Sequence, residues 1–281
     1  MQGNPSSNFK MVLRLFFYLL IFLFLTVVTQ IGGLIFLLSL GMTKWLWKKY
    51  NYQRLLCMSI FLVLYLFATF LIIPLLAPIS GRKALPVSGD MHLQPANFTS
   101  YVLNRHYVKD ELLEAIIDIS NKMHLKHPGI KTLYLDANFP FFEGFPLLPH
   151  LSHDDGEKID LAFIYQSTDG TPLLNQTPTI TGYGYFIPPI KGESNYTKIC
   201  KEKGNWQYDF TGKLTFVNKE RYALDKKLMQ DLLSIIAINN KIKKVFIEPH
   251  LIKRLGFEHN QKFRFQGCHS VRHDDHIHLQ L

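Results

Sequence analysis

Two long stretches without a charged side chain limit how this chain can fold. Residues 15–43 form 29 uncharged, mostly apolar positions, and residues 55–81 form another 27. Each stretch is longer than the roughly 20 residues that an apolar helix needs to cross a bilayer. The sequence therefore predicts a membrane anchor over residues 1–81, with two transmembrane helices at about 15–41 and about 55–79.

The first stretch differs from a secretory signal sequence. Its apolar part is too long, and it lacks the small-residue cleavage pattern. Gly32 and Gly33 allow this helix to bend or tilt. Pro74 predicts a kink in the second helix, because proline has no N–H to donate to the preceding turn.

The connection between the two stretches predicts their orientation. Residues 43–54 carry four Lys or Arg side chains and two Trp, and no Asp or Glu occurs in the first 81 residues. Because cytoplasmic loops are enriched in Lys and Arg, we expect this connection to be cytoplasmic. The N-terminus and the C-terminal domain would then face outward from the cytoplasmic (inner) membrane, towards the periplasm or cell wall. Lys10 and Arg14 favour the opposite side for the N-terminus.

The charge of the outer part argues against a nucleic-acid partner. Six of the 31 Lys and Arg residues precede residue 82, so the remainder has 25 positive and 22 negative residues and a net charge of +3, against +9 for the whole chain. A nucleic-acid-binding domain usually carries a strongly basic face. Cys200 and Cys268 both lie in this part, where a disulfide is chemically allowed, but two cysteines do not establish one.

The outer part predicts one α+β domain. Residues 82–105, with several Pro and Gly, are expected to be a linker, and residues 106–281 are enough for one core. Hydrophobic spacing predicts helices and strands in mixed order, which favours a small mixed or antiparallel sheet with flanking helices. The expected helices are 108–123, 224–238 and 249–257, and the expected strands are 131–137, 158–165, 242–248 and 276–281.

Two histidine clusters carry the chemistry. In the terminal strand "HIHLQL", His276 and His278 project to one face, because alternate residues of a strand share a side. Upstream, "HLSHDDGEKID" supplies His150, His153 and Asp160, with Asp160 on the strand face opposite Ile159 and Leu161. Two His and one carboxylate leave a fourth position open, as in catalytic rather than structural zinc sites.

The two clusters together resemble a known family. The pattern His-x2-His-x2-Gly-x3-Asp, followed downstream by His-x2-His-x-His, is similar to that of the penicillin-insensitive murein endopeptidases, in the wider lysostaphin, D-Ala-D-Ala metallopeptidase and hedgehog fold group. The resemblance covers the outer domain only and depends on about ten positions. The chain departs from the family at Pro149, Lys158 and Gln280, where relatives usually carry Gly, Asp or Ala, and Arg.

The resemblance implies a zinc cleft with defined roles. It makes His153, Asp160 and His278 the ligands of one Zn²⁺ ion. It makes His276 the catalytic histidine, with His150 and His273 lining the site as further candidate catalytic residues. Either Asp274 or Asp275 could orient a ring nitrogen. The implied activity is a zinc metallopeptidase that hydrolyses peptide bonds in peptidoglycan stem peptides. The two predicted transmembrane helices would anchor it in the membrane, with the surrounding membrane lipid as its other partner.

Other interpretations stay open at the level of sequence. A D,D-carboxypeptidase of the same fold group is the second enzyme hypothesis, and a non-catalytic zinc-dependent cell-wall-binding module is the third. Glu143, Tyr183 and Tyr185 could line the cleft or merely pack within the fold. The other histidines are expected at the surface or at helix ends, namely His92, His106, His124, His127, His250 and His259. His269 is close in sequence to the site but is not expected to belong to it.

Overall fold

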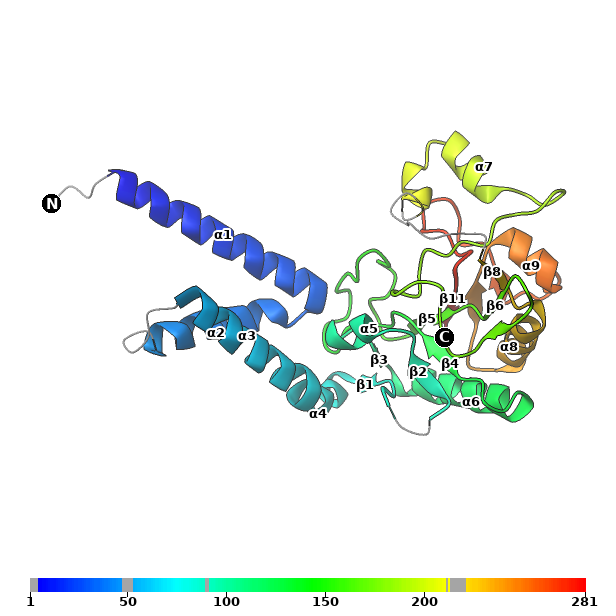
Figure 1. Cartoon of the computed structure of the whole chain (residues 1–281), viewed down its shortest axis with the longest axis horizontal. Helices are drawn as coiled ribbons and strands as arrows, with labels where there is room; N and C mark the ends of the chain where they lie inside the picture. Colours follow the sequence, from blue (N-terminus) through cyan, green and yellow to red (C-terminus); the bar gives the residue numbers. More distant parts are fainter. Residues whose placement is uncertain (1–4, 47–52, 89–90, 211, 213–220) are drawn as a thin grey trace.

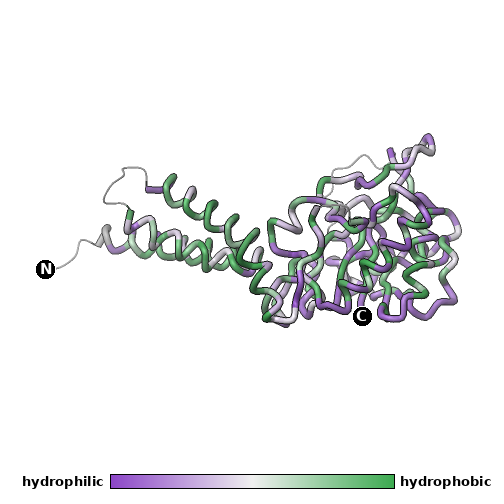
Figure 2. The backbone as a smooth tube through the Cα atoms, turned by 90° about the horizontal axis from the view of Figure 1, so that it is seen from below, coloured by the Kyte–Doolittle hydropathy of each residue, from purple (hydrophilic) through white to green (hydrophobic). Residues whose placement is uncertain are grey.

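The computed structural model describes residues 5–46, 53–88, 91–210, 212 and 221–281. An N-terminal group of helices adjoins a C-terminal α+β domain, and the C-terminus lies within that domain (Figure 1). Hydropathy separates the two parts: Figure 2 shows the helices as largely hydrophobic, whereas hydrophilic and hydrophobic residues intermix in the domain.

The N-terminal part contains two helices that are long and apolar enough to cross a membrane, Asn8–Thr29 and Gln53–Ser80. Between them lies a shorter apolar helix, Gly32–Leu46. The elements are α1 (Pro5–Thr29), α2 (Gly32–Leu46), α3 (Gln53–Phe67), the π-helix η2 (Ala68–Ile72), α4 (Ile73–Leu76) and the 3-10 helix η3 (Ala77–Ser80).

The stretch expected as one helix over 15–41 is two helices, because the chain reverses after α1. Gln30 has a positive φ of 66°, and α2 runs back beside α1 (Figure 1). The glycines allow this close approach: a Cβ on Gly33 would lie 2.0 Å from Thr26 Oγ1. The Gly32 N–H also donates to Thr29 Oγ1 at 2.8 Å. The predicted bend at Gly32 and Gly33 is therefore a full reversal.

This reversal changes the predicted position of the N-terminus. The start of α1 lies at the end of the helical part that is distant from the domain (Figure 1). The end of α2 and the start of α3 lie at the same end. The start of α1 therefore lies opposite the domain, whereas the orientation expected from the sequence puts the N-terminus on the domain's side. Residues 47–52 of the connection, including Trp47, lie outside the described residues.

Pro74 accounts for a local irregularity in the second long helix. Proline cannot donate to the carbonyl four residues earlier, and the turn just before it, η2, is a π-helix. The helical path nevertheless continues from Gln53 to Ser80.

The C-terminal domain is built on a mixed six-stranded sheet in the order β10-β9-β11-β5-β4-β2. The β10–β9 and β2–β4 pairs are parallel, and the other pairs are antiparallel. The strands are β1 (Lys83–Ala84), β2 (Leu93–Pro95), β3 (Tyr107–Val108), β4 (Thr132–Tyr134), β5 (Lys158–Ala162), β6 (Tyr165–Ser167), β7 (Pro172–Leu173), β8 (Tyr222–Leu224), β9 (Lys244–Phe246), β10 (Phe263–Arg264) and β11 (His276–Gln280). The helices are α5 (Phe98–Val102), α6 (Asp110–Lys126), α7 (Tyr196–Glu202), η4 (Trp206–Asp209), α8 (Lys226–Ile238) and α9 (Pro249–Leu255).

The main core lies between this sheet and its helices. Ile159 and Leu161 of β5 and Ile277 and Leu279 of β11 are fully buried in one cluster with apolar residues of α6, α8 and α9. Alternation along a strand then directs the intervening residues to the opposite face. That face carries Asp160 and His278, as the sequence predicts.

Two sequence boundaries differ from the structure. Residues 82–105 are not only a linker: they supply β1, β2 and α5, and Leu85 and Leu93 belong to the core. Residues 158–165 are not one strand, because β5 ends at Ala162 and β6 begins at Tyr165 in a separate three-stranded sheet. Both differences arise from tertiary pairing, which local hydrophobic spacing does not encode.

Candidate metal centre

The centre forms where β5 and β11 pair in the middle of the sheet. His278 of β11 lies directly opposite Asp160 of β5 in the antiparallel register. The backbone N–H of Asp160 donates to the Asp136 carbonyl, and its own carbonyl accepts from the Leu135 N–H. Two rigid neighbouring strands therefore fix the carboxylate and one imidazole relative to each other.

A loop after β4 brings the other two histidines to this point. Arg82 connects the two ends of this loop, residues 139–156. Its guanidinium is almost completely buried and donates to the carbonyls of Phe139 and Asp154. His153 Nδ1 lies 2.7 Å from the Ala137 carbonyl. Because a carbonyl only accepts, this ring nitrogen must carry the proton, and His153 Nε2 is left with a lone pair directed at the centre.

His150, His153 and Asp160 form a buried group that could hold a metal ion, with one ligand atom from each within 4.8 Å of the others. His150 Nδ1 lies 2.8 Å from Asp160 Oδ2, and His153 Nε2 lies 3.2 Å from Asp160 Oδ1. Imidazole and carboxylate are both ligands that zinc and other transition metals accept.

A tighter triangle is formed by His153, Asp160 and His278. His278 Nδ1 lies 3.0 Å from Asp160 Oδ1 and 3.0 Å from His153 Nε2. With the 3.2 Å between His153 and Asp160, all three edges are close to the separation of about 3.3 Å between ligands of a tetrahedral ion with bonds of about 2.0–2.1 Å. The triangle thus has the dimensions of three corners of such a site.

The electrostatics of this cluster favour an ionised Asp160 carboxylate beside rings in different states. Burial lowers the pKa of His153, but the Asp160 carboxylate outweighs burial and raises it. Burial alone would raise the pKa of Asp160, but the charges of His153, His276 and His150 outweigh it and hold that pKa well below its usual value. Burial lowers the pKa of His278 to about 4. A neutral imidazole and an ionised carboxylate are the protonation states that metal binding requires.

His276 has a different environment from His278. Its Nδ1 lies 2.5 Å from Asp275 Oδ1, whereas its Nε2 is buried without a hydrogen-bond partner among the described residues and lies 3.8 Å from Asp160 Oδ2. Burial lowers the pKa of His276, but the Asp160 and Asp275 carboxylates outweigh burial and raise it to about 9. Asp274 instead pairs with Arg272, so Asp275 is the aspartate that orients this ring.

Tyr183, whose role the sequence leaves open, lies in a loop and contacts the centre. Its hydroxyl donates to Asp160 Oδ2 at 2.8 Å, accepts from the Asp136 N–H at 3.1 Å and lies 3.4 Å from His150 Nδ1. Tyr185 packs away from the centre, with its hydroxyl bonded to the backbone of Tyr222. Two tyrosines in the same "GYGYF" segment therefore have separate roles, which no local spacing distinguishes.

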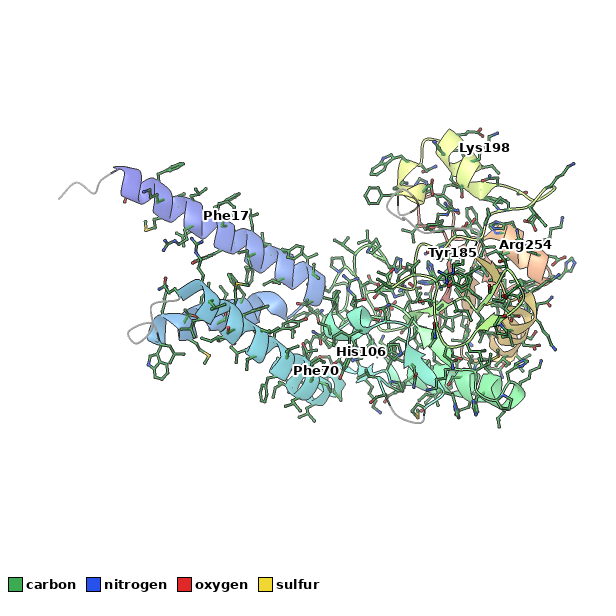
Figure 3. The ribbon with its side chains drawn as sticks, in the orientation of Figure 1. Phe17, Phe70, His106, Tyr185, Lys198 and Arg254 are labelled. Atoms are coloured by element: carbon green, nitrogen blue, oxygen red, sulfur yellow. A yellow bond between two sulfur atoms is a disulfide. The ribbon has the colours of Figure 1, made fainter. Side chains whose placement is uncertain are left out.

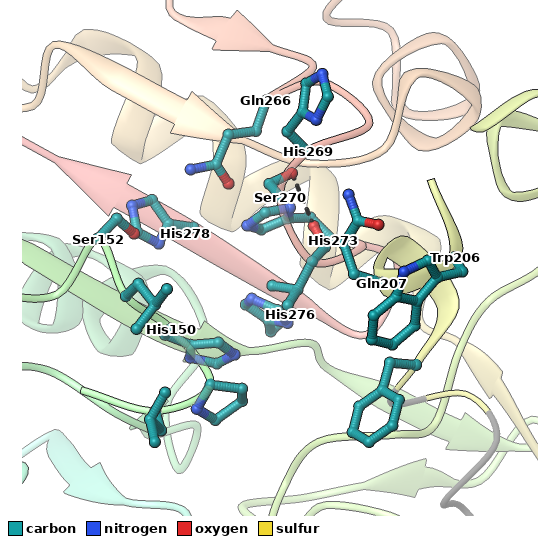
Figure 4. Close-up of a pocket in the computed structure, with 15 residues that line it drawn as sticks. His150, Ser152, Trp206, Gln207, Gln266, His269, Ser270, His273, His276 and His278 are labelled. Atoms are coloured by element: carbon teal, nitrogen blue, oxygen red, sulfur yellow. Dashed lines mark hydrogen bonds between the residues drawn. The ribbon is translucent and has the colours of Figure 1, made fainter. Parts of the chain in front are cut away.

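Two cavities adjoin the centre and share Pro149, His150, Val271 and His276 in their linings. The larger has a volume of about 510 Å³ and contains His273 and His278 as well (Figure 4). Trp206 lies on the side of this cavity opposite His150 (Figure 4). Phe210 also lines the cavity. The smaller cavity, about 350 Å³, borders α5 and Tyr183. Both cavities therefore border the histidine cluster.

A disulfide connects the two segments that wall the larger cavity. Cys200 of α7 is bonded to Cys268, a pairing that sequence analysis left open. The first segment leads into Trp206 and Gln207, and the second contains Gln266 and His269. The bond therefore holds both walls together.

The remaining candidates lie elsewhere. Glu143 pairs with Lys109 and does not line either cavity. His106 is buried rather than at the surface or at a helix end, where it was expected. His250 lies in the first turn of α9, as a helix-end residue, and is also buried. His269 lies at the edge of the larger cavity, outside the triangle.

Comparison with known proteins does not extend these observations. No protein-family model matches the sequence, and no curated protein is significantly similar to it.

Proposed function

We propose that the domain is a zinc peptidase domain in which His153, Asp160 and His278 hold one Zn²⁺ ion. The observation that carries the proposal is the buried triangle of their ligand atoms, with edges of 3.0–3.2 Å. The hydrogen bond from His153 to a backbone carbonyl supports it, because zinc-ligating histidines usually donate their second N–H in this way.

In this proposal His276 is the catalytic histidine, and His150 and His273 line the reaction site. Zinc, when bound, would supply Lewis-acid polarisation of a scissile carbonyl and of an attacking water. The Asp275 carboxylate holds His276 Nδ1, so that Nε2 is directed towards the same space as Asp160 Oδ2. A positioned imidazole of this kind can take up a proton or stabilise a developing oxyanion.

The proposed substrate is the peptide part of peptidoglycan. The resemblance of both histidine clusters to the murein endopeptidases supports this assignment, as do two cavities that both border His276. Digestion of purified peptidoglycan with the zinc-loaded full-length protein, followed by product analysis, tests it. Fragments with new internal ends support an endopeptidase, release of single D-Ala residues indicates a carboxypeptidase, and retention without cleavage indicates a binding module.

We place the protein in the cytoplasmic membrane with its domain facing outward. Lys10, Arg14, Lys44 and Arg54 all lie towards the end of the helical part that is distant from the domain (Figure 1). In the sequence-based orientation, Lys10 and Arg14 oppose the basic connection between the two stretches. In this common position all four basic residues favour the cytoplasmic side, so the conflict is removed.

The metal assignment has its own test. Purified full-length protein should contain about one zinc per chain, and Asp160→Ala or His278→Ala should remove it. His269→Ala is the matched control, because His269 lines the same cavity but lies outside the triangle and should leave the zinc content unchanged. Full zinc content in both Asp160→Ala and His278→Ala would show that other residues bind the ion.

A further inference from the structure

The second long helix is longer than a bilayer core is thick. Gln53–Ser80 spans 28 residues, or about 42 Å at about 1.5 Å per residue, whereas a hydrocarbon core is about 30 Å thick. Arg54 is the charged residue at the start of this helix. A hydrocarbon core that begins near Arg54 therefore reaches about residue 74.

The domain contacts this helix well before that point. The Tyr65 hydroxyl donates to the Val102 carbonyl at 2.7 Å, and Tyr65 lies only 11 residues, about 17 Å, from Arg54. Asn104 Nδ2 lies 3.3 Å from both Tyr65 Oη and Thr69 Oγ1. A domain held wholly in water would leave room for little more than half of a normal hydrocarbon core. These contacts therefore lie at the depth of the outer half of the bilayer.

An aromatic surface continues from the helix onto the domain at this depth, with Phe70 and Tyr101 half-buried and Phe98 exposed. The Phe70 ring lies 5.1 Å from that of Tyr101, which lies 6.2 Å from that of Phe98 in α5. Phe98 is 65% exposed. Figure 3 shows Phe70 on the helical side of this junction and His106 on the domain side, and the Tyr101 ring lies between them.

The loop of residues 139–156, which carries His150 and His153, contacts the α1–α2 turn at a similar depth. The Phe141 N–H donates to Gln30 Oε1 at the α1–α2 turn, with a distance of 3.0 Å. The next residue, Phe142, is 64% exposed. The two segments concerned, 96–104 and 137–142, contain no Asp, Glu, Lys or Arg.

The outer part of the helix remains apolar alongside the domain. Leu75 and Ile79 are 74% and 83% exposed although they follow the first domain contact by 10 and 14 residues. An apolar surface shared by the helix and the domain is expected where both face lipid.

We propose that α5 and residues 137–142 form a membrane seat, through which the domain rests in the outer interface of the bilayer with Phe98 and Phe142 in lipid. The partner is the lipid bilayer that surrounds the helices, because the surface is continuous with their lipid-exposed faces. Asn97, Thr99 and Leu103 of this region also line the smaller cavity, so the seat places the metal centre close to the membrane surface.

Fluorescence of single-tryptophan proteins tests the seat without depending on enzymatic activity. In a full-length Trp45→Phe/Trp47→Phe/Trp206→Phe background, Phe98→Trp and Phe142→Trp place a reporter at the seat. Leu125→Trp is the matched control, because Leu125 is an exposed apolar residue at the end of α6, remote from the helices (Figure 1). Each protein is reconstituted into phosphatidylcholine–phosphatidylglycerol vesicles with or without phosphatidylcholine brominated on its acyl chains.

The proposal expects blue-shifted emission and at least about twofold quenching by brominated lipid for Phe98→Trp and Phe142→Trp, and neither effect for Leu125→Trp. Trp has its own affinity for membrane interfaces, but the control shares it. Circular dichroism verifies that each variant is folded. Emission and quenching at both seat positions equal to those of Leu125→Trp would overturn the seat, whatever the outcome for peptidase activity.

Discussion

Removal of one hydroxyl should weaken metal binding without unfolding the domain. In Tyr183→Phe, Asp160 Oδ2 loses a hydrogen bond of 2.8 Å and the Asp136 N–H loses its acceptor at 3.1 Å. A hydrogen bond to a charged group contributes about 1.5–3 kcal/mol, and about 1.4 kcal/mol corresponds to a factor of ten in affinity. The zinc dissociation constant should therefore rise by about 10- to 100-fold, as for other partners of ligating carboxylates.

Competition with a chromophoric zinc chelator measures this change on the full-length protein in detergent. Tyr185→Phe is the matched control: its hydroxyl also donates one hydrogen bond and accepts one, but both partners are backbone groups of Tyr222 rather than Asp160. The control should lose some thermal stability and keep its zinc affinity. Equal zinc affinities for wild type and Tyr183→Phe would refute the inference that this hydroxyl supports a metal-binding carboxylate.

Three further predictions follow from other parts of the molecule. Burial, followed by the charge of Asp274, raises the pKa of Glu248 from 4.5 to about 7. Stability from this group is therefore complete below about pH 4.5 and falls as the pH rises through about 7, by up to about 3 kcal/mol. Glu248→Gln should remove this dependence in thermal unfolding between pH 5 and pH 8, and parallel curves for the two proteins would contradict it. Gly33→Ala should destabilise the α1–α2 turn by about 1–3 kcal/mol, because its Cβ would meet Thr26 Oγ1 at 2.0 Å, and an unchanged melting temperature would contradict that close approach. Reporters fused at the N-terminus and after residue 50 should both behave as cytoplasmic and one after residue 281 as external, whereas an external N-terminal reporter would contradict the reversal at Gln30.

The sequence predicts the strand-borne half of the candidate site well. Alternation along β5 and β11 places Ile159 and Ile277 in the core, which leaves Asp160 and His278 on the opposite face. This inference needs only the period of a strand and two hydrophobic positions. The register that sets His278 opposite Asp160 comes from the sheet as a whole.

The loop-borne features could not be predicted in the same way. Tyr183 reaches Asp160 through a turn between distant elements, and its spacing is indistinguishable from that of a packing residue such as Tyr185. The reversal at Gln30 depends on a positive φ in an uncharged stretch that composition alone describes as one span. Tertiary contacts decide both features, and neither leaves a periodic signal.

Cleavage of purified peptidoglycan by wild type and His276→Ala, at equal zinc content, tests the proposed peptidase most directly. His153, Asp160 and His278 remain in the variant, so zinc should stay bound while the catalytic histidine is lost. General acid-base and electrostatic contributions of this kind are each about 10²- to 10⁴-fold in rate. The account predicts cleavage by wild type and at least about a hundredfold slower cleavage by His276→Ala. Equal rates for the two proteins, or no cleavage by zinc-loaded wild type, would contradict it.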